Sequence, residues 1–231
     1  MIKKYKISGL EITLCYNTKM GFEKENNQDS CFFNANDSIF AISICDGLGS
    51  AKKSAEGSKK ASELLVNLLT RNEFSKERFQ SEWLECFKEN TKEFNTTAKF
   101  IKISEENIHF GGIGDGLIAI KSERHITTLS DRGEFSNQTA CIFDINYLNA
   151  FTEMDISLNE KAIMIICTDG FSEDIRDEGL NLLLKEAENL FGAESKAKEF
   201  DESLIDLLNN WPNVTNGDDK TVAFIAVRKT K

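Results

Sequence analysis

Apolar and polar residues alternate along the first fifty positions in a way that predicts β-strands. Strand-like runs span residues 5–17, 30–34 and 38–47, and the last of them is almost continuously apolar. The pattern then changes to a helical period, for which we expect Ser50 or Ser54 as the N-cap. The apolar face of this helix comprises Ala55, Ala61, Leu64, Leu65, Leu68 and Leu69.

The middle of the chain predicts one more helix and then several strands. The helix should run from about residue 75 to residue 93, and its aromatic face, Phe79, Trp83, Phe87 and Phe94, is typical of a core. Residues 98–121 predict two strands joined by a turn at 104–107, with glycines interrupting the second strand. Further short strands are expected at 125–129, 139–143 and 147–152.

The last third of the chain fixes the expected fold class. The apolar run at 161–170 predicts a strand that is buried on both faces, and helices at 176–191 and 195–210 precede a closing strand. This order is not a βαβα alternation, so it indicates an α+β fold in which mainly antiparallel sheets are covered by helix pairs. No linker-like stretch divides the 231 residues, and we therefore expect one domain over residues 1–231.

Composition and charge narrow the classes of partner. The net charge of −10 argues against nucleic acid and against anionic membrane surfaces, because both require basic residues. The N-terminus lacks the apolar segment of a signal peptide, and no run of about 18 apolar residues occurs, so we expect a cytoplasmic protein without a membrane span. The six cysteines form no CxxC pair, which favours free thiols in a reducing compartment.

Acidic residues recur where apolar strands end. Asp46, Asp115 and Asp169 each lie beside a glycine at such a position, and the pair Asp218–Asp219 precedes the closing strand. One Asp-Gly pair is an ordinary turn signal, but carboxylates gathered at the ends of buried strands are costly without a compensating cation. If the sheets bring these ends together, the site suits Mg²⁺ or Mn²⁺, which prefer oxygen ligands.

Other phosphate chemistries lack their characteristic residues. No cysteine has an arginine six positions later, as a cysteine phosphatase loop requires, and there is no GxxxxGK[ST] loop. The only histidines are His109 and His125, which makes a zinc site or a Ser-His-Asp triad improbable.

Six motifs occur in an order that resembles the protein phosphatase 2C family, the metal-dependent serine/threonine phosphatases. They are GFEKENNQDS (21–30), FAISICDGLGSAKKSAEGS (40–58), NTTA (95–98), GGIGDGLIAI (111–120), MIICTDGFSEDI (164–175) and DDKTVAFIAV (218–227). Each motif alone is weak, whereas their order over nearly the whole chain is specific. The segment LSDRGEFSNQT (129–139) is similar to a bacterial branch of the family that has a short flap over the site.

The resemblance implies a four-layer αββα sandwich with a metal cleft at one edge of its sheets. By this resemblance Asp46 bridges two Mg²⁺ or Mn²⁺ ions, the Gly47 carbonyl binds one of them, and Asp169 and Asp218 hold the other. Asp29 acts through metal-bound water, and Asp115 matches a ligand of a weaker third ion. The resemblance further implies that a water shared by the two ions attacks the phosphate of phosphoserine or phosphothreonine on a protein. The implied partners are a phosphoprotein substrate and a cognate kinase, and we expect a monomer.

The chain departs from the family on the side that faces the substrate. The phosphate-binding arginine of the family falls at Lys24, a point charge without the bidentate fork of arginine. Leu48 leaves no histidine to act as general acid, Gln28 replaces an acidic residue, and Gly116 follows Asp115 in place of serine. None of the three central aspartates, Asp46, Asp169 and Asp218, is lost.

Two alternatives to a protein phosphatase stay open. The departures at Lys24, Gln28 and Gly116 would also suit a degenerate phosphatase that serves as a module for binding a phosphoprotein or partner. The short flap would also suit a phosphatase for small-molecule phosphates, because the flap region is where substrates are selected.

Overall fold

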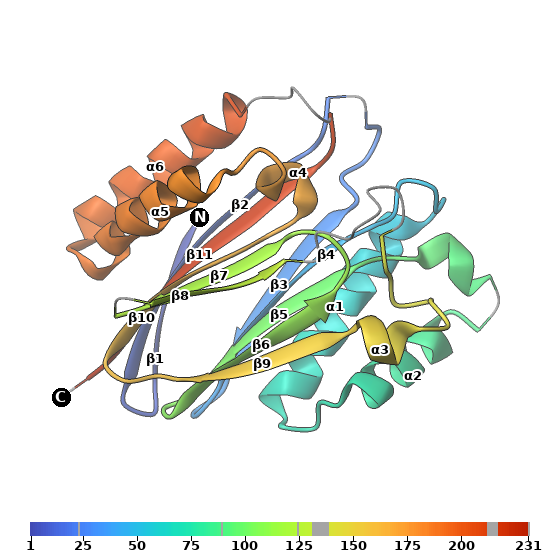
Figure 1. Cartoon of the computed structure of the whole chain (residues 1–231), viewed down its shortest axis with the longest axis horizontal. Helices are drawn as coiled ribbons and strands as arrows, with labels where there is room; N and C mark the ends of the chain where they lie inside the picture. The colour runs from blue at the N-terminus through green and yellow to red at the C-terminus, as the bar shows by residue number, and fades with distance from the viewer. Residues whose placement is uncertain (23, 89, 124, 131–138, 212–216, 231) are drawn as a thin grey trace.

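Two antiparallel sheets form the centre of the molecule, as a computed structural model of the chain shows (Figure 1). The structure describes residues 1–22, 24–88, 90–123, 125–130, 139–211 and 217–230. The six-stranded sheet has the order β1 (Ile2–Ile7), β2 (Leu10–Lys19), β11 (Lys220–Lys229), β10 (Lys161–Cys167), β7 (Leu117–Ser122) and β8 (His125–Ser130). The five-stranded sheet has the order β3 (Asp29–Ala35), β4 (Phe40–Asp46), β5 (Ala98–Ile103), β6 (Asn107–Ile113) and β9 (Thr152–Ser157).

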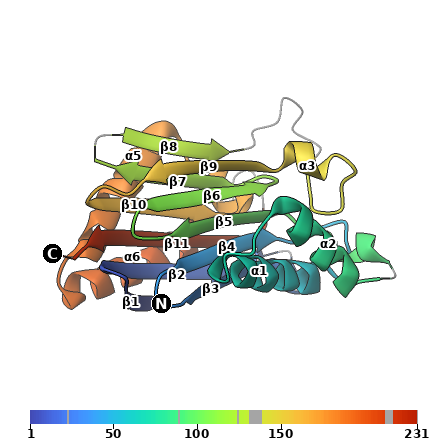
Figure 2. The same cartoon turned by 90° about the horizontal axis from the view of Figure 1, so that it is seen from below.

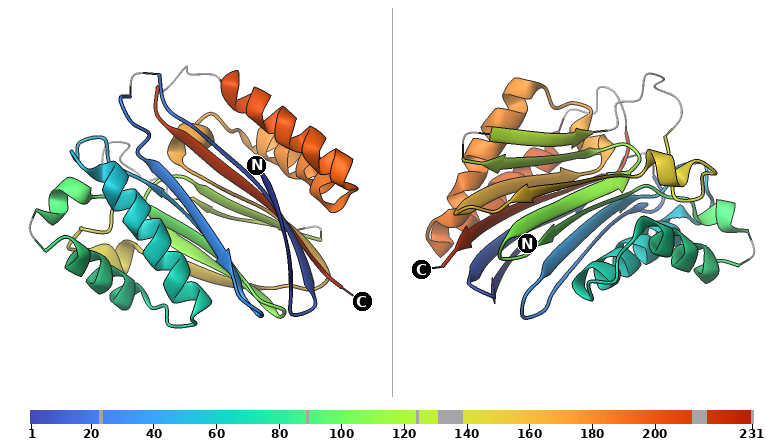
Figure 3. Two further views of the ribbon diagram at one scale, coloured as in Figure 1. Left: turned by 180° about the vertical axis from the view of Figure 1, so that it is seen from behind. Right: turned by 60° about the horizontal axis from the view of Figure 1, so that its bottom comes forward.

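Helices cover the outer face of each sheet, so that the two sheets lie between two helical layers (Figures 2 and 3). The layer on the five-stranded sheet contains α1 (Ser54–Thr70), α2 (Lys76–Cys86), the short 3-10 helix η1 (Thr91–Phe94) and α3 (Tyr147–Ala150). The layer on the six-stranded sheet contains α4 (Asp169–Ser172), α5 (Asp177–Glu186), η2 (Ala187–Phe191) and α6 (Glu194–Asn209). Within the described ranges, no helix is long and apolar enough to cross a membrane. The predicted α+β sandwich is confirmed.

Strand β10 shows how the sequence pattern produces these layers. Met164 and Ile166 point into the apolar layer between the sheets, whereas Ile163, Ile165 and Cys167 point to the layer beneath α5 and α6. Because side chains alternate between the faces of a strand, an uninterrupted apolar run is what a strand covered on both faces requires. This agrees with the prediction for residues 161–170.

The glycines at 111–116 carry the chain from one sheet to the other. Residues 98–121 form three strands rather than the two predicted, since β6 belongs to the five-stranded sheet and β7 to the six-stranded sheet. Gly114 and Gly116 have φ angles of 90° and 100°, which other residues rarely adopt. The glycines that were expected to interrupt one strand therefore end it and start another.

The start of α1 differs from the prediction in its capping. The N-cap position is Lys53, which makes no side-chain capping bond, and Ser54 is the first helical residue. Ser54 instead uses its hydroxyl oxygen to accept a hydrogen bond from the Gln28 amide at 2.6 Å. The next helix, α2, does begin at a capping serine, because the Ser75 hydroxyl accepts from the Arg78 N–H at 3.2 Å.

Two of the predicted short strands are wrong. Residues 139–143 form no strand, and 147–152 contain the helical turn α3, after which β9 begins at Thr152. The Asp144 carboxylate accepts the Cys141 N–H at 2.8 Å, and the Asn95 side chain accepts the Phe143 N–H at 3.3 Å. These side-chain acceptors satisfy backbone donors locally, so the segment needs no strand partner. Most of the predicted flap, residues 131–138, lies outside the described residues.

Candidate metal centre

The ends of strands from both sheets meet at one edge of the sandwich. Asp29 begins β3 and Asp46 ends β4, and the two residues are direct partners in the antiparallel register. Asp169 follows β10, and Asp218 precedes β11, which pairs with β10. The five-stranded sheet thus supplies one pair of aspartates and the six-stranded sheet supplies the other. The structure therefore brings together four of the aspartates that the sequence singled out.

The three central carboxylates lie close enough to repel one another, in a site that is only partly open to water. Burial raises the pKa of Asp46 well above its ordinary value, and the charges of Asp29, Asp169 and Asp218 raise it further. Burial likewise raises the pKa of Asp169, whose side chain shares a hydrogen bond with Asp46. Raised pKa values mean that protons are held more tightly here than in water, so the site favours a positive charge.

Asp29 has one carboxylate oxygen with a hydrogen-bond partner and one without. Its Oδ2 accepts a hydrogen bond of 2.8 Å from the Thr168 hydroxyl, and Thr168 itself receives the Thr221 N–H at 3.0 Å. Its Oδ1 is buried and has no hydrogen-bond partner among the described residues. Burial raises the pKa of Asp29 to about 7. A buried carboxylate oxygen without a partner indicates that a group of the working site is still to be supplied.

Asp219 supports the site by accepting hydrogen bonds from the backbone and is not one of the predicted metal ligands. This role was not predicted from the sequence. Its two carboxylate oxygens accept the backbone N–H groups of Gly21 at 2.8 Å and Gln28 at 2.7 Å. These bonds tie the segment before β3 to the segment before β11. The carbonyl of Asp219 is packed against Gly170, where a Cβ would lie only 2.1 Å from that oxygen. The close approach explains why glycine follows Asp169.

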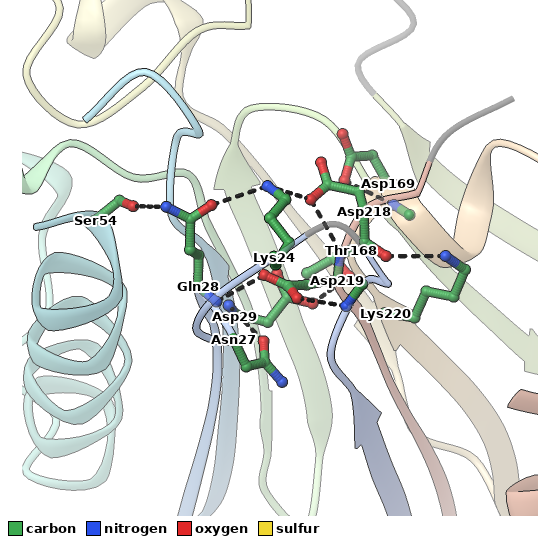
Figure 4. Close-up of polar contacts among 12 residues, drawn as sticks. Lys24, Asn27, Gln28, Asp29, Ser54, Thr168, Asp169, Asp218, Asp219 and Lys220 are labelled. Atoms are coloured by element: carbon green, nitrogen blue, oxygen red, sulfur yellow. Dashed lines mark hydrogen bonds and ion pairs between the residues drawn. The ribbon is translucent and has the colours of Figure 1, made fainter. Parts of the chain in front are cut away.

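Lys24 contacts the edge of the aspartate cluster (Figure 4). Its ammonium lies 2.6 Å from Asp218 Oδ1 and donates to Gln28 Oε1 at 2.9 Å. Burial lowers the pKa of Lys24, but the hydrogen bond and charge of Asp218, with the charges of Asp219 and Asp46, outweigh burial and raise it. Lys24 is therefore a firmly protonated cation at the site.

Gly47 and Asp115 complete the set of predicted residues. Gly47 follows β4 and pairs with Thr96 in an isolated bridge, and a Cβ here would lie 2.7 Å from backbone atoms of Ser54. Asp115 lies in the crossing between β6 and β7, where its Oδ2 accepts a hydrogen bond from the Thr139 hydroxyl. Its charge helps to raise the pKa of Asp169.

Two buried lysines near the cluster were not singled out from the sequence. Lys99 and Lys220 are each 2% exposed. The Lys99 ammonium donates to the Gly114 carbonyl at 2.7 Å, and the Lys220 ammonium donates to the Asp218 carbonyl at 2.9 Å. Lys99 thus binds the carbonyl next to Asp115, and Lys220 binds the carbonyl of Asp218 itself, so each lysine places a positive charge beside an aspartate. The sequence does not mark either lysine as buried, because Lys99 shares β5 with Lys102 and Lys220 is the first residue of β11.

The donor chemistry of the site fits a hard divalent cation. The gathered side chains offer carboxylate oxygens, which Mg²⁺ and Mn²⁺ prefer, and Asp29 has an oxygen left without a partner. In the described part of the chain, however, no three His, Cys, Asp or Glu side chains already form a group that could hold an ion. Asp218 is instead paired with the Lys24 ammonium.

The αββα arrangement and the acidic ends of its strands agree with the family that the motif order resembles. The family model described as protein phosphatase 2C matches residues 22–209. The chain belongs to the protein phosphatase 2C family, as its motif order predicted. A search of curated protein sequences gave no significant match.

Solved structures share this fold at low sequence identity. RsbX in complex with magnesium is 16% identical with a TM-score of 0.62, over 99% of this chain and all of that one. The catalytic domain of the serine/threonine phosphatase PstP with two manganese ions is 17% identical with a TM-score of 0.63, over 95% of this chain and all of the other. Stp1 from Staphylococcus aureus is 16% identical with a TM-score of 0.64, over 94% and 95% of the two chains.

Proposed function

We propose that this chain hydrolyses phosphoserine and phosphothreonine on proteins and depends on Mg²⁺ or Mn²⁺. The observation that carries the proposal is the group of aspartates that two sheets bring together. Burial and neighbouring carboxylates raise the pKa of three of them, Asp29, Asp46 and Asp169. Membership of the protein phosphatase 2C family supports the reaction class. The magnesium and manganese in the RsbX and PstP structures support the choice of cation.

Each residue of the cluster has a distinct part in this proposal. Asp46 ends β4 and is affected by the charges of Asp29, Asp169 and Asp218, and it would bridge two ions, with the Gly47 carbonyl as a further ligand of one of them. Asp169 and Asp218 would hold the second ion, Asp29 would act through water, and Asp115 would serve a third. When bound, the ions supply Lewis acidity, which lowers the pKa of a shared water and neutralises phosphoryl oxygens.

The remaining assignments concern binding of the substrate phosphate and protonation of the leaving oxygen. Lys24 is a protonated cation at the rim of the cluster, and we assign it to the phosphate group. Leu48 follows the Asp46–Gly47 pair and has no proton to give, so the leaving serine or threonine oxygen takes its proton from solvent. The phosphoprotein substrate would be the product of a cognate kinase, and the enzyme would act as a monomer.

The proposal is tested by turnover of p-nitrophenyl phosphate and of phosphopeptides with Mn²⁺. We expect activity that chelators abolish and that Asp46→Asn and Asp169→Asn each reduce by about a hundredfold or more. Equal activity in the variants, or no activity with any divalent cation, would refute the proposal. The absence of metal binding in calorimetry would favour the binding module instead.

A panel of phosphorylated metabolites addresses the second alternative. We expect phosphopeptides to give the higher kcat/KM, because family membership points to protein substrates. Efficient turnover of metabolites alone would instead establish a small-molecule phosphatase. The same panel measured on Lys24→Met should show weaker use of every phosphorylated substrate, since the charge of Lys24 is assigned to the phosphate that all of them share.

A further inference from the structure

Lys24 occupies a position in which it competes with a divalent cation. Its ammonium lies 2.6 Å from a carboxylate oxygen of Asp218, which is one of the ligands assigned above. The two side chains are only 25% and 32% exposed, so water screens the pair weakly. An Asp218 oxygen paired with an ammonium at this distance has to exchange that partner before it can coordinate an ion.

Gln28 and Ser54 hold the ammonium in this position. Gln28 Oε1 accepts from Lys24 at 2.9 Å, and Gln28 Nε2 donates to the Ser54 hydroxyl oxygen at 2.6 Å (Figure 4). The Ser54 residue is 1% exposed at the first turn of α1. The amide therefore has one orientation that satisfies both neighbours, with its oxygen toward Lys24.

The backbone of Gln28 is fixed as firmly as its side chain. Its N–H donates to Asp219 Oδ2 at 2.7 Å, and its carbonyl accepts from the Ser58 hydroxyl at 2.6 Å and from the Gly47 N–H at 3.1 Å. Because the backbone of Gln28 is held at three points, its side chain can fix the position of the Lys24 ammonium. A glutamine here, rather than an acidic residue, also leaves the charge of Lys24 to be balanced by Asp218.

The positive charge of Lys24 stabilises the aspartate cluster by compensating part of its negative charge. Asp46 and Asp169 share a hydrogen bond, whereas Asp218 faces outward to Lys24. Carboxylates that are brought together without cations destabilise the fold, because each is removed from water beside others of the same sign. The Lys24 ammonium compensates the charge of one of them, Asp218.

We propose that Lys24, positioned by Gln28 and Ser54, is a displaceable counter-ion that holds Asp218 until a divalent cation arrives. This inference rests on the proposed function of the site. Once Asp218 coordinates an ion, the same ammonium is released to face the phosphate group of the substrate. One side chain thereby links metal loading to phosphate binding, and the metal affinity of the protein includes the cost of displacing Lys24.

Calorimetric titration of the metal-free protein with Mn²⁺ tests the displacement. We expect Lys24→Met to tighten Mn²⁺ binding by about threefold to tenfold, since the competing ion pair is gone. Lys24→Arg keeps a cation that can pair with Asp218, so its affinity should stay within about threefold of the wild type.

Lys220→Met is the matched control. Lys220 also donates to Asp218, but to its carbonyl oxygen, so its removal changes the nearby charge without freeing the carboxylate. Displacement predicts a larger gain in affinity for Lys24→Met than for Lys220→Met. Equal gains would mean that charge alone matters and would overturn the proposal. Thermal melts of both variants verify that the comparison is made on folded protein.

Gln28 is tested as a positioning residue by a double-mutant cycle. Gln28→Met removes both side-chain hydrogen bonds, and we expect it to tighten Mn²⁺ binding by about twofold to threefold in the wild-type background. If Gln28 acts through Lys24, it should have no effect in the Lys24→Met background. A full additive effect there would contradict the positioning role.

The same titrations separate failure of this inference from failure of the proposed function. Wild-type protein that binds Mn²⁺ and cleaves phosphopeptides, with no gain in affinity for Lys24→Met, would overturn the counter-ion role and leave the phosphatase intact. A complete absence of Mn²⁺ binding in the wild type and in Lys24→Met would overturn both.

Discussion

The layer between the two sheets is apolar along most of its length and acidic at one end, although the same strands build both parts. In β10, Met164 and Ile166 belong to the apolar part, and Asp169 follows the strand only three positions after Ile166. The apolar part needs nothing beyond the chain, because burial itself stabilises it. The acidic part contains Asp46 and Asp169, whose pKa values are raised, so a nearby positive charge would stabilise it. One pair of sheets thus contains a region stabilised by its own burial and a region whose carboxylates favour a bound cation.

The largest expected effect comes from the acidic end. Asp46→Asn should reduce phosphatase turnover by about a thousandfold, because it removes the carboxylate assigned to both ions. The metal-free variant should nevertheless melt at a higher temperature than the wild type, since a buried carboxylate with a raised pKa is gone. Activity assays and calorimetric melts in EDTA measure the two effects. A variant that loses stability in EDTA would contradict the contrast between the two regions.

The apolar part should respond in the opposite way. Phe110 in β6 is fully buried between the sheets, and Phe110→Ala should lower the free energy of unfolding by about 3–5 kcal/mol. Urea denaturation measures this loss, with Phe110→Leu as a milder control that keeps part of the volume. Mn²⁺ affinity measured below the unfolding transition should be unchanged. A large change in that affinity would show that the two regions are coupled.

The stability of the metal-free protein should fall as the pH rises. Burial raises the pKa of Asp29 from 3.8 to about 7, so the folded state keeps its proton over a range in which the unfolded chain has lost it. The folded state therefore binds more protons than the unfolded state between about pH 4 and pH 7, and the free energy of unfolding decreases across that window by on the order of 2–4 kcal/mol.

Urea titrations in EDTA at several pH values measure this dependence. Asp29→Asn should flatten it, because asparagine has no proton to lose. Saturating Mn²⁺ should reverse it, since the ion replaces the protons and binds best to ionised carboxylates. A metal-free protein that becomes more stable between pH 4 and pH 7 would contradict the assignment of an excess negative charge to this end.

The smallest expected effect concerns the close packing of Gly170, which follows Asp169, against the carbonyl of Asp219. A Cβ at Gly170 would lie 2.1 Å from the Asp219 carbonyl, so Gly170→Ala should cost about 1–3 kcal/mol and weaken Mn²⁺ binding. Gly179→Ala in α5 is the control, because its Cβ would meet nothing closer than 4.0 Å and alanine favours a helix. Equal behaviour of the two variants would show that the close approach at Gly170 is not required.

The fold class and the main aspartates could be predicted because both leave a strong trace in the sequence. Buried strands produce apolar runs, and each central aspartate stands beside one end of such a run. The helical turn at Tyr147–Ala150 left no such trace. It forms where Asn95 and Asp144 cap nearby backbone groups, and Asn95 lies about fifty residues away in the chain. Contacts of this kind depend on the completed fold.

The supporting residues of the site were missed for the same reason. Asp219 could be read as one more ligand, yet its oxygens accept N–H groups from Gly21 and Gln28, nearly 200 residues away. Ser54 looks like a helix cap in the sequence, and only the packing of α1 against β3 turns it toward Gln28. The positions of the candidate ligands could be predicted from local sequence pattern, whereas the residues that orient them depend on tertiary contacts.

The origin of the aspartates in both sheets has a mechanical consequence. Asp29 and Asp46 belong to the five-stranded sheet, and Asp169 and Asp218 border the six-stranded one. An ion held by Asp46 from one sheet and by Asp169 and Asp218 from the other would link the two sheets, so separating them at this edge would require breaking its bonds to the carboxylates. Amide hydrogen exchange at the end of β4 and at the end of β10 should therefore slow to a similar extent when the ion binds, because local opening of either sheet at this edge would then require release of the ion.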